Sequence, residues 1–131
     1  MDNLLYIILA FIGLLLLMQL WMRISTWRKK GKEVTGIGGR MGKDISEGGR
    51  FLFYFYTNSC AACKAMTPLI DKLSAEYNNI HKVNLATEMD TGRKFGVMGT
   101  PALVLVEGQR IQEFLLGARS ESFLRNLLSI E

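Results

Sequence analysis

The sequence predicts an α/β domain with a mixed β-sheet flanked by helices, preceded by a single N-terminal transmembrane helix. Two observations carry this prediction: an uncharged apolar run near the N-terminus, and an alternation of strand-like and helix-like segments after residue 50. A chain of 131 residues has room for one small domain and an appendage. We therefore divide it into residues 1–30 (anchor with a basic flank), 31–49 (glycine-rich linker) and 50–131 (folded domain).

The segment from Leu4 to Met22 is apolar except for Gln19 and carries no charge. As a helix it would be about 28 Å long, close to the roughly 30 Å hydrocarbon core of a bilayer. A cleaved signal peptide has a preceding basic residue, a shorter apolar run and a small-x-small site, none of which occurs here. A helix packed on a soluble core keeps a polar face, and this segment has none. We therefore expect residues 4–22 to lie in the lipid bilayer as a permanent single-pass anchor in the cell (inner) membrane.

The charges on the two sides of the apolar run differ. Only the α-amino group and Asp2 precede it, whereas five basic residues follow: Arg23, Arg28, Lys29, Lys30 and Lys32. The positive-inside rule then places the C-terminal domain in the cytoplasm, with a periplasmic domain as the alternative. We expect this basic cluster to contact anionic lipid headgroups. Because no basic stripe with interleaved aromatic residues occurs elsewhere, nucleic-acid binding is not expected.

Residues 31–49 contain seven glycines among scattered charges and few apolar positions. Within them, Gly36 to Gly42 superficially resembles a loop that cradles phosphate. No strand pattern precedes that loop and no helical pattern follows it, so the context that would confirm a phosphate site is missing. We expect a linker or a loosely ordered entry segment here.

The first strand of the domain is predicted at residues 51–56, where F-L-F-Y-F-Y is dense in strand-favouring residues. A helix is predicted over residues 60–77, because Thr57, Asn58 and Ser59 are small polar residues able to cap its N-terminus. Its apolar residues recur at helical spacing: Met66, Leu69, Ile70, Leu73 and Tyr77.

The remaining elements follow in order: a strand at residues 80–85, a short helix at 88–95, strands at 102–106 and 110–116, and a helix at 120–130. Glu107-Gly108-Gln109 forms the turn of a hairpin between the last two strands. The strand–helix–strand unit predicts two parallel strands, and the hairpin adds antiparallel ones. A mixed sheet with helices on its faces results. A domain of about eighty residues has a small core, so we expect modest stability.

The chain has two cysteines, Cys60 and Cys63, which stand where the predicted strand gives way to the helix. A cysteine in the first helical turn feels the positive end of the helix dipole and unpaired N–H groups, which favour its thiolate. Residues three apart on a helix are about 5–6 Å apart at Cβ, near enough to form a disulfide after small adjustments. The pair therefore predicts a dithiol that can close and reopen.

Two other uses of a cysteine pair are open at this point. Half of a zinc site would need two further ligands; the single histidine, His81, stands at the start of a strand, and a four-cysteine site would require a dimer. A purely structural disulfide that closes so short a loop would restrict the unfolded chain little. We expect no metal site, and no cofactor other than a redox-active Cys60–Cys63 disulfide.

The stretch from Phe51 to Gly117 resembles the thioredoxin family. Five landmarks carry the resemblance: Cys60-Ala61-Ala62-Cys63-Lys64 after an aromatic strand, Pro68 five residues after the second cysteine, Lys82-Val83-Asn84-Leu85 as a core strand, Lys94 to Pro101 as a segment ending in a cis-proline, and Gly117 after the last strand. The resemblance implies a thioredoxin-like fold with a reduced N-terminal β–α element.

The sequence departs from the family pattern in two regions. The glycine-rich segment is expected to replace the first strand and helix of the family, and the dipeptide between the cysteines is Ala-Ala. Ser59 stands at the position of the usual tryptophan, and Tyr54 replaces a buried aspartate that helps to move the proton of the second cysteine. Lys82 matches the lysine that partners this aspartate. Tyr54 is either a packed ring or a hydroxyl that assists Cys63.

The resemblance implies thiol–disulfide exchange with Cys60 as the nucleophile and Cys63 as the resolving cysteine. Lys64 and the helix N-terminus should both lower the pKa of Cys60. A cis Thr100–Pro101 bond should pack against the cysteines and expose the Thr100 backbone to an extended segment of a substrate.

Two functions follow as hypotheses. The first is a membrane-tethered thiol–disulfide oxidoreductase that acts on disulfides or dithiols of partner proteins, with a recycling reductase or oxidase as a second partner. The alternative is a non-catalytic thioredoxin-like adaptor subunit of a membrane complex, which the loss of the buried carboxylate favours.

Overall fold

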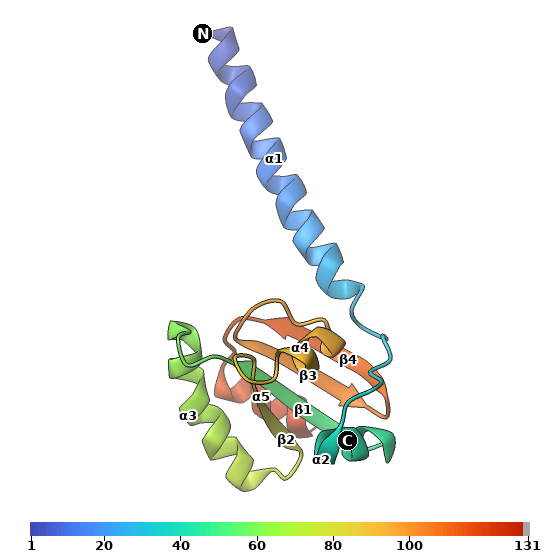
Figure 1. Cartoon of the computed structure of the whole chain (residues 1–131). Helices are drawn as coiled ribbons and strands as arrows, with labels where there is room; N and C mark the ends of the chain where they lie inside the picture. Colours follow the sequence, from blue (N-terminus) through green and yellow to red (C-terminus); the bar gives the residue numbers. More distant parts are fainter. Residues whose placement is uncertain (130–131) are drawn as a thin grey trace.

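In the computed structural model, which describes residues 1–129, a long helix leads into a small α/β domain (Figure 1). The elements in chain order are α1 (Asp2–Trp27), α2 (Gly39–Ser46), β1 (Arg50–Tyr56), α3 (Ala61–Glu76), β2 (Ile80–Asn84), α4 (Met89–Phe95), β3 (Ala102–Glu107), β4 (Arg110–Leu116) and α5 (Glu121–Ser129). Residue 130 of the last predicted helix lies outside the described residues.

Within the described part of the chain, four strands form one sheet in the order β2-β1-β3-β4. Strand β1 pairs in parallel with β2 and in antiparallel fashion with β3, and β3 and β4 form the predicted hairpin. The predicted α/β fold with a mixed sheet is therefore confirmed.

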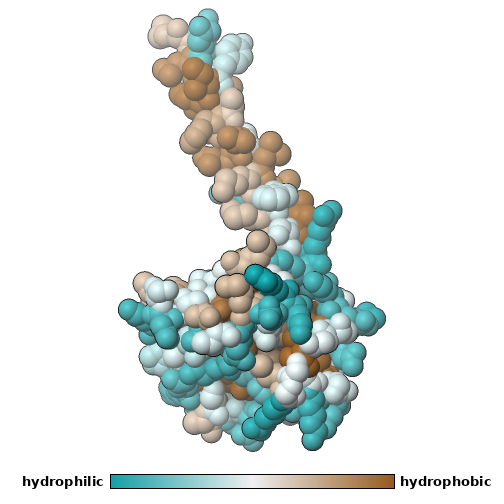
Figure 2. All heavy atoms as spheres, viewed as in Figure 1, coloured by the Kyte–Doolittle hydropathy of each residue, from teal (hydrophilic) through white to brown (hydrophobic). Residues whose placement is uncertain are grey.

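Helix α1 projects away from the domain (Figure 1), and its apolar side chains are exposed along its length (Figure 2). Its segment Asp2–Ser25 is long and apolar enough to cross a membrane, and its most apolar stretch is not buried at all. The predicted span at residues 4–22 thus lies inside one uninterrupted helix.

Helices α3 and α5 cover one face of the sheet. Leu52 and Tyr54 of β1 pack there with Ile70 of α3 and Leu124 of α5, and all four side chains are fully buried. Because successive side chains of a strand point to opposite faces, the neighbouring residues of β1 must be covered from the other side.

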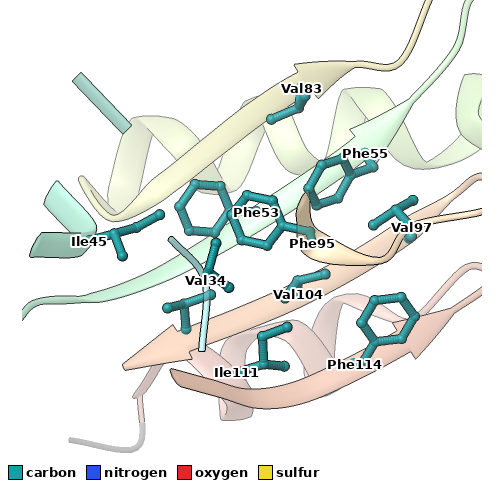
Figure 3. Packing of buried hydrophobic residues seen from close by; sticks show 12 residues of the cluster. Val34, Ile45, Phe53, Phe55, Val83, Phe95, Val97, Val104, Ile111 and Phe114 are labelled. Atoms are coloured by element: carbon teal, nitrogen blue, oxygen red, sulfur yellow. The ribbon is translucent and has the colours of Figure 1, made fainter. Parts of the chain in front are cut away.

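The second face is covered by α4 and by the glycine-rich segment that precedes β1. Phe53 and Phe55 of β1 pack there against Phe95 of α4, with Val34 and Ile45 closing the cluster (Figure 3). Coverage of both faces explains why β1 is a continuous apolar run rather than an alternating one.

The expectation of a loosely ordered linker is wrong for residues 33–46. Glu33 forms an isolated β-bridge with Arg110 of β4, and α2 follows within the same segment. Only 2% of Val34 and 3% of Ile45 is exposed, so both belong to the core. The reduced N-terminal β–α element is present as this bridge and short helix.

The glycines explain how a segment so poor in apolar residues reaches the sheet. Gly36 and Gly39 have φ angles of 74° and 66°, a left-handed conformation that turns the chain at little cost for glycine. Met41 and Ile45 are four residues apart, which places them on one face of α2, and Ile37 precedes the helix. This spacing is the sequence signal that could have located the helix.

Helix α2 is also tied to the edge strand β2. Nε2 of His81 lies 3.0 Å from Oδ2 of Asp44, and the His81 ring stacks on Phe53 with the ring centroids 5.1 Å apart. The predicted strand-edge position of His81 is confirmed. Its polar partner comes from the segment expected to be a linker.

Replacing Ile45 with alanine should lower the free energy of unfolding by about 2–4 kcal/mol, because buried methyl groups are lost and a cavity remains. Urea unfolding of the detergent-solubilised full chain, followed by near-UV circular dichroism, measures this loss. Lys43→Ala in the same helix is the control: its side chain is 74% exposed, so stability should change by less than about 0.5 kcal/mol. Equal stability of the two variants would show that α2 does not belong to the core.

Candidate redox site

The two cysteines lie at the start of α3, directly after β1. Cys60 is the N-cap residue of α3, with an extended backbone (φ −82°, ψ 116°). Its Sγ accepts a hydrogen bond of 3.1 Å from the backbone N–H of Cys63. The small polar residues before it were predicted to cap the helix, but the Cys60 sulfur satisfies this N–H instead. A sulfur thus occupies the position where side-chain oxygens usually meet the free N–H groups of a helix.

The two sulfurs differ in exposure. Cys60 is partly exposed, whereas Cys63, one helical turn further along, is 1% exposed. They form a disulfide, with their Cα atoms 5.1 Å apart. In the reduced state, the Cys63 N–H and the positive end of the α3 dipole would both favour negative charge on the Cys60 sulfur. Among the described residues, no group of three or more His, Cys, Asp or Glu side chains is placed to hold a metal ion.

The predicted proline stands at the same edge of the sheet. The Thr100–Pro101 peptide bond is cis, and Pro101 is buried. Because Phe55 pairs with Ala102, the C-terminal end of β1 and the N-terminal end of β3 coincide. The cysteine turn leaves the sheet at this edge, and the Thr100–Pro101 segment enters it there. The N–H of Gly117 donates a hydrogen bond of 2.8 Å to the Pro101 carbonyl, which ties the end of β4 to the same place.

Tyr54 stands where the resemblance described above leads us to expect a buried aspartate, and it is fully buried. Its hydroxyl donates to the carbonyl oxygen of Cys63 at 3.3 Å and lies 3.0 Å from Oγ1 of Thr67. Burial raises the pKa of the Tyr54 hydroxyl, while the hydrogen bond with Thr67 opposes the rise. The neutral hydroxyls of Tyr54 and Thr67 therefore lie next to each other, and that of Tyr54 is bonded to the backbone of Cys63. Sequence reasoning missed Thr67, although its position four residues after Cys63 on α3 places the two on the same helix face.

The two predicted lysines lie on the surface. Nζ of Lys82 pairs with Oδ1 of Asp71 at 2.6 Å and lies 5.5 Å from the ring centroid of Tyr56. Lys82 thus has a carboxylate partner on α3, although the aspartate expected for it is absent. Lys64 is exposed on the first turns of α3.

A hollow of about 340 Å³ opens beside α3 and reaches the inner cysteine. Its lining includes Cys63, Lys64, Thr67 and Pro68. The structure thereby brings Cys63, Lys64 and Thr67 around one opening, which Tyr56 also lines.

Replacing Tyr54 with phenylalanine should lower the free energy of unfolding by about 1 kcal/mol at neutral pH, because its hydrogen bonds are lost. The raised pKa of Tyr54 also predicts a pH effect. Above pH 10 Tyr54 has lost its hydroxyl proton in the unfolded chain but still holds it in the folded chain. The contribution of Tyr54 to the free energy of unfolding therefore falls as pH rises through the folded pKa. Urea unfolding on both sides of pH 10 should show a shallower fall for Tyr54→Phe than for the wild type. Parallel curves would contradict this assignment.

The family model for thioredoxin matches residues 41–129, which include both cysteines and the cis-proline. The chain belongs to the thioredoxin family. This membership agrees with the geometry: a partly exposed and a buried cysteine at a helix N-terminus, at the same sheet edge as a cis-proline that precedes a strand.

Thioredoxins from two bacteria are similar to this thioredoxin-family protein in sequence. The thioredoxin of Pseudomonas aeruginosa is 30% identical over 83 residues, which cover 61% of this chain and 77% of the relative. That of Buchnera aphidicola subsp. Schizaphis graminum is 28% identical over 90 residues, 66% of this chain and 83% of the relative. The structure of a mutant thioredoxin from Halobacterium salinarum matches with a TM-score of 0.60 at 24% identity, over 70% of this chain and 84% of that one, which supports the fold.

With the Cys60–Cys63 pair in place, this thioredoxin-family protein is a thiol–disulfide oxidoreductase. Membership of the family implies protein disulfides as substrates and a reductase as a partner.

Proposed function

We propose that this protein is a membrane-tethered thiol–disulfide oxidoreductase in which Cys60 is the nucleophile and Cys63 the resolving cysteine. The difference between the two sulfurs carries the proposal. Cys60 is partly exposed and accepts the N–H of Cys63, whereas Cys63 is buried. An accessible, stabilised thiolate is the group that attacks a disulfide of a partner.

In the reducing direction, the Cys60 thiolate attacks one sulfur of the partner's disulfide, whose S–S bond breaks. The other partner sulfur leaves as a thiolate and takes up a proton. The Cys63 thiolate then attacks the Cys60 sulfur, which closes the intramolecular disulfide and releases the first partner sulfur as a thiol. Two electrons pass from the dithiol to the partner, so the chemistry requires no cofactor. A dithiol reductase restores the pair, and an oxidase would drive the same steps backwards.

The surrounding residues have supporting roles in this scheme. The backbone of Thr100, before the cis-proline Pro101, would pair with an extended segment of the substrate as a short β-bridge. Lys64 would add positive charge near the Cys60 thiolate. Tyr54 would hold the backbone of Cys63 through its hydroxyl. Lys82, paired with Asp71, would contribute surface charge rather than a proton.

The apolar helix α1 would anchor the domain in the cell (inner) membrane as a single span, with the domain in the cytoplasm because basic residues follow the span. A membrane-impermeant maleimide tests this orientation at Cys60 in intact, reductant-treated cells. We expect labelling only after lysis. Strong labelling of intact cells would place the domain on the periplasmic side.

An adaptor function is the second candidate, because a neutral tyrosine replaces the buried carboxylate expected beneath Cys63. Cys63→Ser separates the two functions. An oxidoreductase with this change should accumulate mixed disulfides between Cys60 and its partners, visible on non-reducing gels and absent from Cys60→Ser/Cys63→Ser. An adaptor would retain the same partners in both variants without a covalent link.

A further inference from the structure

The connection between the anchor and the domain is short and bonded to the sheet. Helix α1 ends at Trp27. Soon after it, the N–H of Gly31 donates a hydrogen bond of 2.7 Å to the carbonyl of Ile111 on β4. The N–H of Ile111 donates in turn to the carbonyl of Lys32 at 3.0 Å, and that of Val34 donates to Gln109 at 2.7 Å. The chain after α1 therefore lies along the edge strand, which restricts how far the domain can rotate relative to the helix.

Two lysines strengthen this attachment. Nζ of Lys29 donates to the carbonyl of Gly96 at 2.7 Å and lies 4.5 Å from the ring centroid of Phe114. Nζ of Lys30 pairs with Oε2 of Glu113 at 2.8 Å. The anchor thus contacts both β4 and the end of α4.

The Lys29 contact is joined to the cis-proline segment through one short connection. Gly96, which accepts the Lys29 bond, begins the connection that ends at the Thr100–Pro101 bond. A hollow of about 230 Å³ separates Trp27 from Leu116, the residue before the Gly117 that bonds to Pro101. Figure 1 shows α1 rising from the side of the domain on which the α4–β3 connection and the first turn of α3 lie, whereas α2 lies at the opposite side.

Chain length sets an upper limit on how far each end of this contact lies from the span and from Thr100. Ser25, the end of the candidate span, and Lys29 are four residues apart, as are Gly96 and Thr100. Four residues of chain extend over at most about 14 Å. The same region exposes apolar side chains: Met98 is 92% exposed, Trp27 73% and Leu116 43%.

We propose that the cysteines on which this enzyme acts belong to integral membrane proteins and lie at the level of the lipid headgroups. This inference rests on the proposed function. A substrate segment that pairs with Thr100 would run between the domain and the bilayer, where a juxtamembrane segment of another membrane protein already lies. The exposed Met98, Trp27 and Leu116 would contact its apolar residues. A large soluble protein would have to enter the same space against the lipid surface.

A single-turnover experiment in proteoliposomes tests the proposal. The pre-reduced full chain supplies two electrons to a single-span reporter helix that carries one disulfide. In one reporter the disulfide directly follows the span; in the other it lies about 25 residues further along a flexible Gly/Ser tail, roughly 25–30 Å away. We expect the near disulfide to be reduced about tenfold faster, because its effective concentration at the site is higher.

A variant with about fifteen Gly/Ser residues inserted between Trp27 and Arg28 uncouples the domain from the span while leaving the Lys29 and Lys30 contacts in place. Its two rates should agree within about threefold. Reduction of a small water-soluble disulfide reagent, equal in both proteins, is the control. If the reagent reacts but the wild type does not favour the near disulfide, this inference is wrong and the proposed function stands. If neither protein reduces the reagent, the proposed function itself fails.

Discussion

Cys60→Ser should bring the rate of protein-disulfide reduction down to the uncatalysed background, a loss on the order of 10³-fold or more. The serine hydroxyl cannot form a disulfide with the partner, so the covalent intermediate cannot form. The rate is measured with a protein disulfide as substrate and dithiothreitol as the regenerating reductant. Ala65→Ser, an exposed position on the same helix, is the matched control and should keep the wild-type rate within about threefold.

The buried Cys63 should not take over when Cys60 is lost. Only 1% of its surface is exposed, so a partner's disulfide has much less access to it than to Cys60. A Cys60→Ser protein that retained a tenth or more of the wild-type rate would therefore overturn the assignment of nucleophile and resolving cysteine.

Phe53→Ala should lower the free energy of unfolding by about 3–5 kcal/mol, the largest stability effect we expect from one substitution. Phe53 is fully buried at the centre of the cluster beneath α4, and its ring centroid lies 4.7 Å from that of Phe95 and 5.1 Å from that of His81. Removing the ring leaves a cavity between β1 and α4, which cannot move together to fill it. Small domains have about 5–15 kcal/mol of total stability, so much of it would be lost.

Urea unfolding of the detergent-solubilised chain, followed by near-UV circular dichroism, measures the effect of Phe53→Ala. Met98→Ala is the control for truncating a large apolar side chain, because Met98 is 92% exposed and should change stability by less than about 0.5 kcal/mol. A loss below about 1 kcal/mol at Phe53 would show that the α4 side of the sheet is not well packed.

The sheet could be predicted where local composition was strong. The aromatic run at residues 51–56 indicated β1 within one residue of its observed start, and the Gly108 turn correctly separated β3 from β4. Helix α3 was predicted within one residue at either end because its apolar residues repeat every three or four positions. These signals are contained in short windows of sequence.

The segment before β1 was misjudged because its information is not local. Seven glycines among few apolar residues resemble a flexible linker, and α2 has eight residues, too few for a helix to be stable alone. Its stability comes from Val34 and Ile45, which are buried against Phe53 and its neighbours on the sheet. Only the assembled sheet offers that surface.

The site divides in the same way. Cys60, Cys63 and Pro101 could be named from sequence, because the spacing of the cysteines and the position of the proline belong to recognisable motifs. The partners of Tyr54 and Lys82 could not. The hydrogen bond of Tyr54 with Thr67 and the ion pair of Lys82 with Asp71 depend on how α3 lies across β1 and β2. A helix rotated by a few tens of degrees would offer different residues.

By itself, the sequence determined the chemistry and the types of element: a pair of thiols at a helix start, an apolar helix long enough to cross a bilayer, and strands that must be covered on both faces. The tertiary structure alone decided which sulfur is accessible, which hydroxyl bonds to the backbone of Cys63, and that the chain after the apolar helix bonds to Gly96 at the end of α4. The physical reason is the sequence distance over which each effect acts. Propensity and dipole effects act within a few residues of one segment, whereas exposure and orientation arise only when distant segments pack together.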